Sequence, residues 1–215
     1  MSQQLDGTLG FVAHRSYEQY CPIAAALDVL GDRWNLLILR ELTMGERRFT
    51  DLKAALPGIA PNLLADRLRD LQADGLVEQR ELPPPAARTV YAVTADGRDA
   101  VPVLRALARF GAGRLGAPDD GVAVRPRTAV YGMVAPYHAP EPAGERFHAR
   151  LLVDGETFDL VSEGSELSLR RRHDEVPDLE LEISARDLVA ARQHRAAPLP
   201  ASERAQRFAR LYQLA

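Results

Sequence analysis

The chain has 215 residues, 46% apolar and 27% charged, a composition typical of one large or two small globular domains. It has no run of about 18 apolar residues and no basic start followed by an apolar stretch, so we expect neither a membrane-spanning helix nor a secretion signal. The net charge of −3 argues against binding nucleic acid through bulk positive charge, and the single cysteine excludes an internal disulfide and indicates a cytoplasmic location.

Helical periodicity extends over residues 22–115 and is interrupted once, by two strands. Apolar residues at helical spacing predict a first helix over 23–30 and a second over 34–42. Gly31 is expected to end the first helix, and Asp32 is placed to cap the second.

The next two helices differ in length. Thr50 is the expected N-cap of a short helix, and Pro61 suits the first turn of a longer one that ends at Gly75. The apolar positions of the longer helix predict a buried stripe made of Leu64, Leu68 and Leu71.

Two β-rich runs follow, at 76–82 and 88–94, and the proline-rich loop between them predicts a hairpin. Thr94 is placed to cap a long helix that reaches Leu115. Pro102 either kinks this helix or delays its regular part.

Residues 116–128 are expected to form a linker, which divides the chain into domains 1–118 and 119–215. The first domain holds equal numbers of basic and acidic side chains, 14 of each. Any surface for nucleic acid on this domain must therefore be a local patch.

After a short helix expected at 129–138, the sequence period changes to two. The strands FHARLLV and ETFDLV flank Asp154-Gly155, the strongest hairpin signal in the chain, and the alternation continues to Ile183. Ser184 and Ser202 are placed to cap two closing helices. The second domain is therefore expected to be an antiparallel sheet with helices, and the whole chain an α+β protein.

Three helices followed by a two-stranded hairpin are typical of a winged helix-turn-helix, whose third helix enters the major groove of DNA. Burial of the three leucines turns Asn62, Asp66 and Arg69 outward, and Asn and Arg side chains can read adenine and guanine. Nearby basic side chains are expected on phosphates. The residues expected to contact DNA are Arg47, Arg48, Thr50, Lys53, Pro61, Asn62, Asp66, Arg69 and Arg88. The alternative is an ordinary solvated helix face.

Three runs within about 17–115 resemble the HxlR-type family of bacterial regulators: CPIAAALDVLGDRWNLLILREL, RRFTDLKAALPGIAPNLLADRLRDLQADGLVEQR and RTVYAVTADG. The resemblance implies a homodimeric winged-helix repressor or activator of near-palindromic double-stranded DNA, with the dimer made by the N-terminal segment and the long helix after the hairpin. Two positions depart from the family pattern. Ala60 stands where a helix-capping serine is common, and Asp66 places a negative charge where neutral or basic residues are common.

Cys21 matches a cysteine that some relatives in this family use to sense oxidants or electrophiles, and a helix start favours a reactive thiol. The alternative is a small apolar residue packed at the dimer seam. The five histidines have no metal-ligand spacing, and no phosphate loop, nucleophile elbow or HExxH motif occurs. We therefore expect no metal, no cofactor and no enzyme.

The runs FHARLLVDGETFDLVSEGSELSLRR and PDLELEISARDLVAAR resemble the later part of a sterol-carrier-protein-type lipid-binding domain. This resemblance implies an apolar tunnel for a small hydrophobic molecule. The tunnel would be lined by Leu151, Val153, Phe158, Leu160, Leu181, Ile183, Leu188 and Phe208. A filled core that serves dimerisation or a partner would use the same residues.

The leading hypothesis is a homodimeric, sequence-specific DNA-binding transcriptional regulator that responds to a small hydrophobic effector. Two alternatives stay open. One is a redox- or electrophile-sensing regulator that acts through Cys21. The other is a lipid-carrier or protein-interaction module that does not bind DNA.

Overall fold

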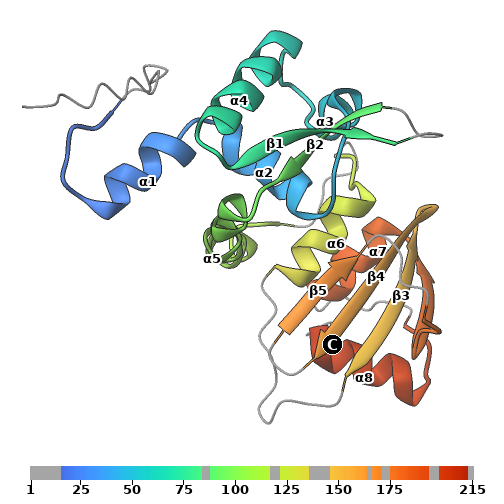
Figure 1. The fold of residues 1–215 in the computed structure, drawn as a ribbon. Helices are drawn as coiled ribbons and strands as arrows, with labels where there is room; N and C mark the ends of the chain where they lie inside the picture. Colours follow the sequence, from blue (N-terminus) through green and yellow to red (C-terminus); the bar gives the residue numbers. More distant parts are fainter. Residues whose placement is uncertain are drawn as a thin grey trace, which may run out of the picture. The chain divides into compact units, whose positions relative to one another are not determined.

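The computed structural model describes residues 16–83, 88–116, 122–135, 146–163, 166–170, 175–193 and 199–212. The chain divides into two compact units, Met1–Val101 and Pro102–Ala215. The first unit is mostly helical and the second is a sheet with helices, so the expected α+β class is confirmed (Figure 1). Among the described residues, no helix is long and apolar enough to cross a membrane.

The first unit contains helices and a two-stranded wing in the order that the sequence predicts. Its elements are α1 (Pro22–Leu30), α2 (Asn35–Thr43), α3 (Phe49–Ala55), α4 (Pro61–Ala73), β1 (Val77–Leu82) and β2 (Arg88–Val93). Strands β1 and β2 are antiparallel, with Val77 opposite Val93 and Leu82 opposite Arg88. Residues 84–87, which form most of the expected hairpin loop, lie outside the described residues.

The core of the first unit forms around α2 and α4. The expected leucine stripe of α4 is confirmed, because Leu64, Leu68 and Leu71 are each at most 1% exposed. Ile38 and Leu39 of α2 are fully buried as well. These side chains fix the rotation of α4 about its own axis, and with it the residues that α4 turns to solvent.

Two expected helix caps are wrong. Helix α2 begins at Asn35 after Trp34, and the Asp32 carboxylate instead pairs with Arg67 of α4. Helix α3 begins after Arg48, whose backbone N–H donates to Oδ2 of Asp51 at 3.2 Å. Thr50 lies in the first turn, exposed. Helix α2 thus begins without a side-chain cap, and the start of α3 is bonded by Asp51 of its own first turn.

The start of the long helix follows the prediction for Thr94. Its hydroxyl accepts the Gly97 N–H at 2.9 Å and opens a 3-10 helix, η1 (Asp96–Asp99), which leads into α5 (Ala100–Ala112). Pro102 lies in the first turn of α5, where a missing N–H costs no hydrogen bond. Pro102 is therefore compatible with the first turn of α5, which begins two residues before it. The division between the two units falls at this point, whereas the linker expected from composition lies at 116–128.

Besides α5 from Pro102 onward, the second unit contains a four-stranded sheet and three further helices within the described residues. They are α6 (Pro126–Val134), β3 (Phe147–Val153), β4 (Glu156–Glu163), β5 (Glu166–Arg170), β6 (Leu179–Ile183), α7 (Ala185–Arg192) and α8 (Glu203–Tyr212). Helix α6 starts three residues before the expected 129, because Pro126 is preset for a first helical turn. Residues 136–138 of that expected helix lie outside the described part.

The strand order of the sheet is β5-β4-β3-β6. The predicted hairpin is confirmed: β3 and β4 are antiparallel, and both Asp154 and Gly155 have positive φ angles of 44° and 85°. Strand β4 also pairs antiparallel with β5, but β6 runs parallel to β3. Alternating hydrophobicity marks a half-buried strand without specifying its direction, so the sequence could not distinguish this pairing.

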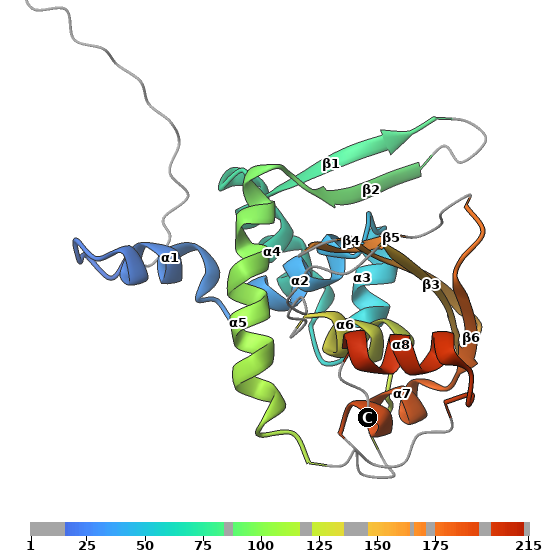
Figure 2. The same cartoon turned by 90° about the horizontal axis from the view of Figure 1, so that it is seen from below.

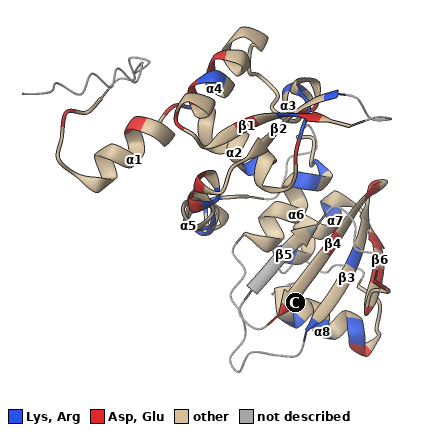
Figure 3. Ribbon diagram, viewed as in Figure 1, with Lys and Arg blue, Asp and Glu red and all other residues tan. Residues whose placement is uncertain are grey.

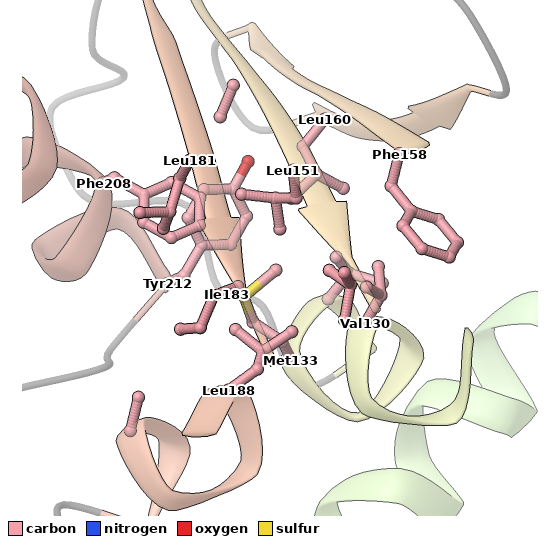
Figure 4. Close-up of a cluster of buried hydrophobic side chains, with 14 of the residues drawn as sticks. Val130, Met133, Leu151, Phe158, Leu160, Leu181, Ile183, Leu188, Phe208 and Tyr212 are labelled. Atoms are coloured by element: carbon pink, nitrogen blue, oxygen red, sulfur yellow. The ribbon is translucent and has the colours of Figure 1, made fainter. Parts of the chain in front are cut away.

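Helices α6, α7 and α8 cover one face of the sheet (Figure 2). The inward side chains Leu151, Leu181 and Ile183 meet Phe208 and Tyr212 of α8, along with residues of α6 and α7 (Figure 4). Both expected serine caps are confirmed. Ser184 accepts from the Asp187 N–H at 3.0 Å, and Ser202 from the Ala205 N–H at 3.2 Å.

Candidate nucleic-acid interface

Helix α4 presents one polar face to solvent. Asn62, Asp66 and Arg69 are all exposed, and their spacing of four and then three residues places them on the same side of the helix. The opposite side is the leucine stripe. This is the arrangement that a groove-reading helix needs, because a rigid backbone must hold its reading side chains outward.

The first turn of α4 has no side-chain cap. Its N-cap is Ala60, followed by Pro61 at the first helical position. The N–H groups at a helix start carry partial positive charge, and without a capping oxygen they can donate to an anion. Ala60 therefore leaves this helix start without a side-chain cap.

Helix α4 carries both positive and negative side chains (Figure 3). Nη1 of Arg69 lies 2.9 Å from Oδ1 of Asp66, in a pair that is more than half exposed. Arg67 forms a different kind of pair: its Nη1 lies 3.0 Å from Oδ2 of Asp70 and also contacts Asp32. The Arg67 side chain is largely buried, and its contact with Asp32 links α4 to the segment before α2.

Two of the expected phosphate-binding cations lie at α3, Arg48 as its N-cap residue and Lys53 within the helix. Arg48 is exposed, and its Nε lies 3.3 Å from Oδ2 of Asp51. Lys53 is half-buried one turn further along, and Thr50 is exposed between them. The charge of Arg48 is thus partly neutralised by a carboxylate in the first turn of the helix that follows it.

Arg47 lies in a different environment from the other basic candidates. Its backbone N–H donates to the Tyr91 carbonyl at 2.9 Å and its carbonyl accepts the Tyr91 N–H at 2.7 Å, which adds Arg47 to the edge of β2. Its side chain is only 13% exposed, with Nη2 at 3.9 Å from Oε2 of Glu41. This geometry links α2 to the wing through Arg47.

Glu41 is a residue that the sequence reasoning missed. Its carboxylate is 1% exposed and accepts from Nη2 of Arg40 at 2.8 Å. The sequence did contain a sign of this burial. Glu41 comes three residues after Ile38, and this spacing puts it on the apolar stripe of α2. A charge on a buried stripe needs a cationic partner within the fold.

Arg88 is the exposed first residue of β2, opposite Leu82 at the outer end of the wing. Elsewhere on the wing, Arg80 pairs with Glu78 across two residues of β1. The wing therefore carries both signs of charge, and Arg88 is its cation nearest the hairpin end among the described residues.

Cys21 is the N-cap residue of α1 and is half-buried. Helix α1 buries only Ala24, while Ile23 is 71% exposed and Leu27 43%. The apolar face expected from the sequence thus lies on the surface of the monomer.

Helix α5, like α1, exposes apolar side chains on the surface of the monomer. Val103, Leu107 and Phe110 lie on its exposed side, and the Phe110 ring is 62% exposed although the Arg114 guanidinium stacks 3.6 Å from its centroid. Exposed apolar side chains at helical spacing are typical of a helix that meets another protein surface.

The eight residues expected to line a ligand tunnel lie together in the buried cluster of the second unit. None is more than 7% exposed, and Figure 4, which labels all of them except Val153, shows the labelled side chains among residues of α6, α7 and α8. The structure therefore brings these residues together, as the sequence predicts, in the interior of the unit.

The opposite face of the same sheet holds a polar group that the sequence reasoning did not find. Oδ1 of Asp159 lies 2.8 Å from Nε2 of His148 and 2.9 Å from Nε of Arg150. Asp159 is fully buried and His148 is 1% exposed. The sign in the sequence was an aspartate inside the apolar strand FDLV. In the fold its carboxylate pairs with His148 and Arg150 of the neighbouring strand.

Comparison with known proteins shows which family the first part of the chain resembles. Residues 29–118 match the model of the HxlR-like helix-turn-helix family. An HTH-type transcriptional regulator of Synechocystis sp. is 41% identical over 91 residues, which cover 42% of this chain and 67% of the relative. The HTH-type transcriptional regulator YvaP of Bacillus subtilis is 32% identical over 93 residues, covering 43% of this chain and 86% of YvaP.

A third relative is the HTH-type transcriptional regulator YodB of Bacillus subtilis, 36% identical over 78 residues, which cover 36% of this chain and 70% of YodB. The solved reduced form of YodB aligns with 47% of this chain and 100% of its own, at 31% identity and a TM-score of 0.40. The sterol-carrier-type resemblance of the second unit is not confirmed by these matches. From the winged-helix part, however, the chain belongs to the HxlR-like helix-turn-helix family of DNA-binding transcriptional regulators.

Proposed function

We propose that this regulator is a homodimer that reads double-stranded DNA with α4 in the major groove and the β1–β2 wing on the flanking backbone. The observation that carries the proposal is the single exposed face of α4, with Asn62, Asp66 and Arg69 held outward by three buried leucines. Asn can bond an adenine edge in two places, and Arg a guanine edge.

The affinity that does not depend on sequence comes from the groups around α4. In this proposal the donors to phosphate are Arg48 before α3, Lys53 of α3, Arg88 of the wing and the uncapped N–H groups after Ala60. Thr50 and Pro61 lie at the exposed starts of their helices and add contact area. Because the first domain has no net charge, this local set must supply the attraction to DNA.

Two copies are needed to read a near-palindromic site, and the exposed apolar side chains of α1 and α5 support a dimer. Each helix exposes more apolar surface than a solvated helix of a monomer requires. A homodimer would bury both segments against their symmetry copies and hold two α4 helices at a fixed spacing.

The decisive experiment is selection from a pool of random duplexes with the purified full chain, followed by sequencing of the retained DNA. An enriched, two-fold symmetric motif supports the proposal. Asn62→Ala and Arg69→Ala should each relax one position of the motif. Arg210→Ala, an exposed helical arginine of the second unit, serves as the matched control and should leave the motif unchanged. An unenriched pool contradicts sequence-specific reading.

The response to a small hydrophobic effector is a finer part of the proposal, and the apolar cluster between the sheet and α8 is its proposed place. An effector held among Leu181 and Phe208 would stabilise the fold by RT ln(1 + [L]/Kd), about 2.7 kcal/mol at a hundredfold excess over Kd. A thermal-shift screen of hydrophobic metabolites on the full chain tests this. A compound that stabilises the protein without changing DNA affinity would make the second unit a carrier.

A second candidate function is sensing of oxidants or electrophiles through Cys21. The specific observation is its place at the N-cap of α1, a helix whose apolar side chains are proposed to form the dimer. Modification of the thiol at that point would alter the dimer surface directly, and so the spacing of the two reading helices.

A further inference from the structure

Asp66 and Arg69 form an ion pair on the exposed face of α4. Nη1 of Arg69 lies 2.9 Å from Oδ1 of Asp66, and the two side chains are 67% and 53% exposed. Both belong to the face that is proposed to meet DNA. A carboxylate at such a position repels phosphate, so it lowers the affinity of the helix for any polyanion.

We propose that Asp66 is a specificity-determining residue, which holds the Arg69 guanidinium for a guanine edge and disfavours its contact with phosphate. The inference rests on the proposed function, because it takes α4 as the reading helix. It adds a role for Asp66 within that helix.

The hydrogen-bonding capacity of arginine allows both contacts at once. A guanidinium has five N–H donors, and the bond to Asp66 uses one of those on Nη1. Guanine needs two donors, for O6 and N7. Arg69 can therefore read guanine while its pair with Asp66 stays intact, and the carboxylate fixes the orientation of the guanidinium plane.

A phosphate contact has the opposite electrostatics. Moving Arg69 to the DNA backbone either breaks the pair or brings the Asp66 carboxylate close to a second anion, and both raise the free energy of that contact. Guanine O6 and N7 carry only partial negative charge. The same carboxylate thus weakens non-specific binding more than it weakens the specific contact.

The pair is not explained by its contribution to the stability of α4. Exposed pairs of this spacing contribute little, because solvent screens them. The structural pairing of α4 is made instead by Arg67, whose side chain is only 22% exposed and joins Asp70 and Asp32. Among the described residues, Asp66–Arg69 is the pair that lies on the reading face.

The test compares Asp66→Asn with Glu78→Gln. Both substitutions neutralise one carboxylate in an exposed Arg pair of the same unit, since Arg80 and Glu78 are 52% and 42% exposed, but Glu78 lies on the wing. Binding is measured by fluorescence anisotropy on a duplex enriched by the wild-type protein and on a scrambled duplex of the same length. Each titration is repeated from about 0.05 to 0.2 M salt.

We expect Asp66→Asn to bind the scrambled duplex about two- to fivefold more tightly than Glu78→Gln does. The slope of log affinity against log salt should steepen by about one, for one added phosphate contact. Discrimination at one guanine should fall about tenfold. In the double variant Asp66→Asn with Arg69→Ala, the gain in non-specific affinity should disappear, because the effect requires the arginine.

Equal ratios of specific to non-specific affinity in Asp66→Asn and Glu78→Gln would overturn the inference and leave the proposed function standing. A gain that persists in the double variant would overturn it too, since Asp66 would then act on DNA through its own charge. If the wild-type protein binds both duplexes equally, the proposed function itself fails.

Discussion

Phe110 gives the most direct test of the proposed dimer. Its ring is 62% exposed on α5, next to Leu107, which is 45% exposed. Full burial of a phenylalanine side chain contributes about 1.5–3 kcal/mol, so covering the exposed part of this ring contributes about 1–2 kcal/mol. A two-fold dimer contains the contact twice, which makes the total about 2–4 kcal/mol.

The substitution Phe110→Ala should therefore weaken the dimer by about 30- to 700-fold, at 1.4 kcal/mol for each tenfold change in Kd. The fold of the protomer should be preserved, because the ring lies on the surface. Sedimentation equilibrium over a dilution series measures the dissociation constant directly. Light scattering at micromolar concentration should show dimers for the wild type and monomers for a variant at the upper end of this range.

The matched control is Val176→Ala, which truncates an apolar side chain that is 92% exposed in the second unit. Its dissociation constant should equal that of the wild type. The reasoning is refuted if the wild type is a monomer at micromolar concentration. It is also refuted if the Phe110→Ala dimer dissociates within threefold of the control.

Three further substitutions have defined outcomes. Arg88→Ala should weaken binding to all duplexes equally and reduce the salt slope by about one, and an unchanged slope would place Arg88 away from phosphate. Leu68→Ala, at a position 1% exposed, should lower the free energy of unfolding by about 2–5 kcal/mol in urea titrations. A loss below about 1 kcal/mol would show that the leucine stripe does not hold α4 in the core. Cys21→Ser should keep DNA affinity and abolish its change with diamide or a quinone, and a variant that responds like the wild type would exclude Cys21 as the sensor.

Local patterns in the sequence were sufficient for the order and type of most elements. The leucine stripe of α4 follows from a period near 3.6, and the β3–β4 hairpin from two alternating runs around Asp154-Gly155. These features depend on residues a few positions apart, which are neighbours in the folded and the unfolded chain alike. The outward direction of Asn62 and Arg69 follows from the same stripe.

Only the tertiary structure decided which charged side chains are exposed to solvent and which are paired within the fold. Arg47 and Arg48 are adjacent in the sequence, yet Arg47 lies beside the buried Glu41 and pairs with Tyr91, while Arg48 is exposed. Asp32 leaves its expected cap for Arg67, 35 residues away. The parallel pairing of β6 with β3 is another long-range choice. An ion pair or a strand pairing depends on where distant segments meet, and hydrophobic periodicity carries no information about that meeting.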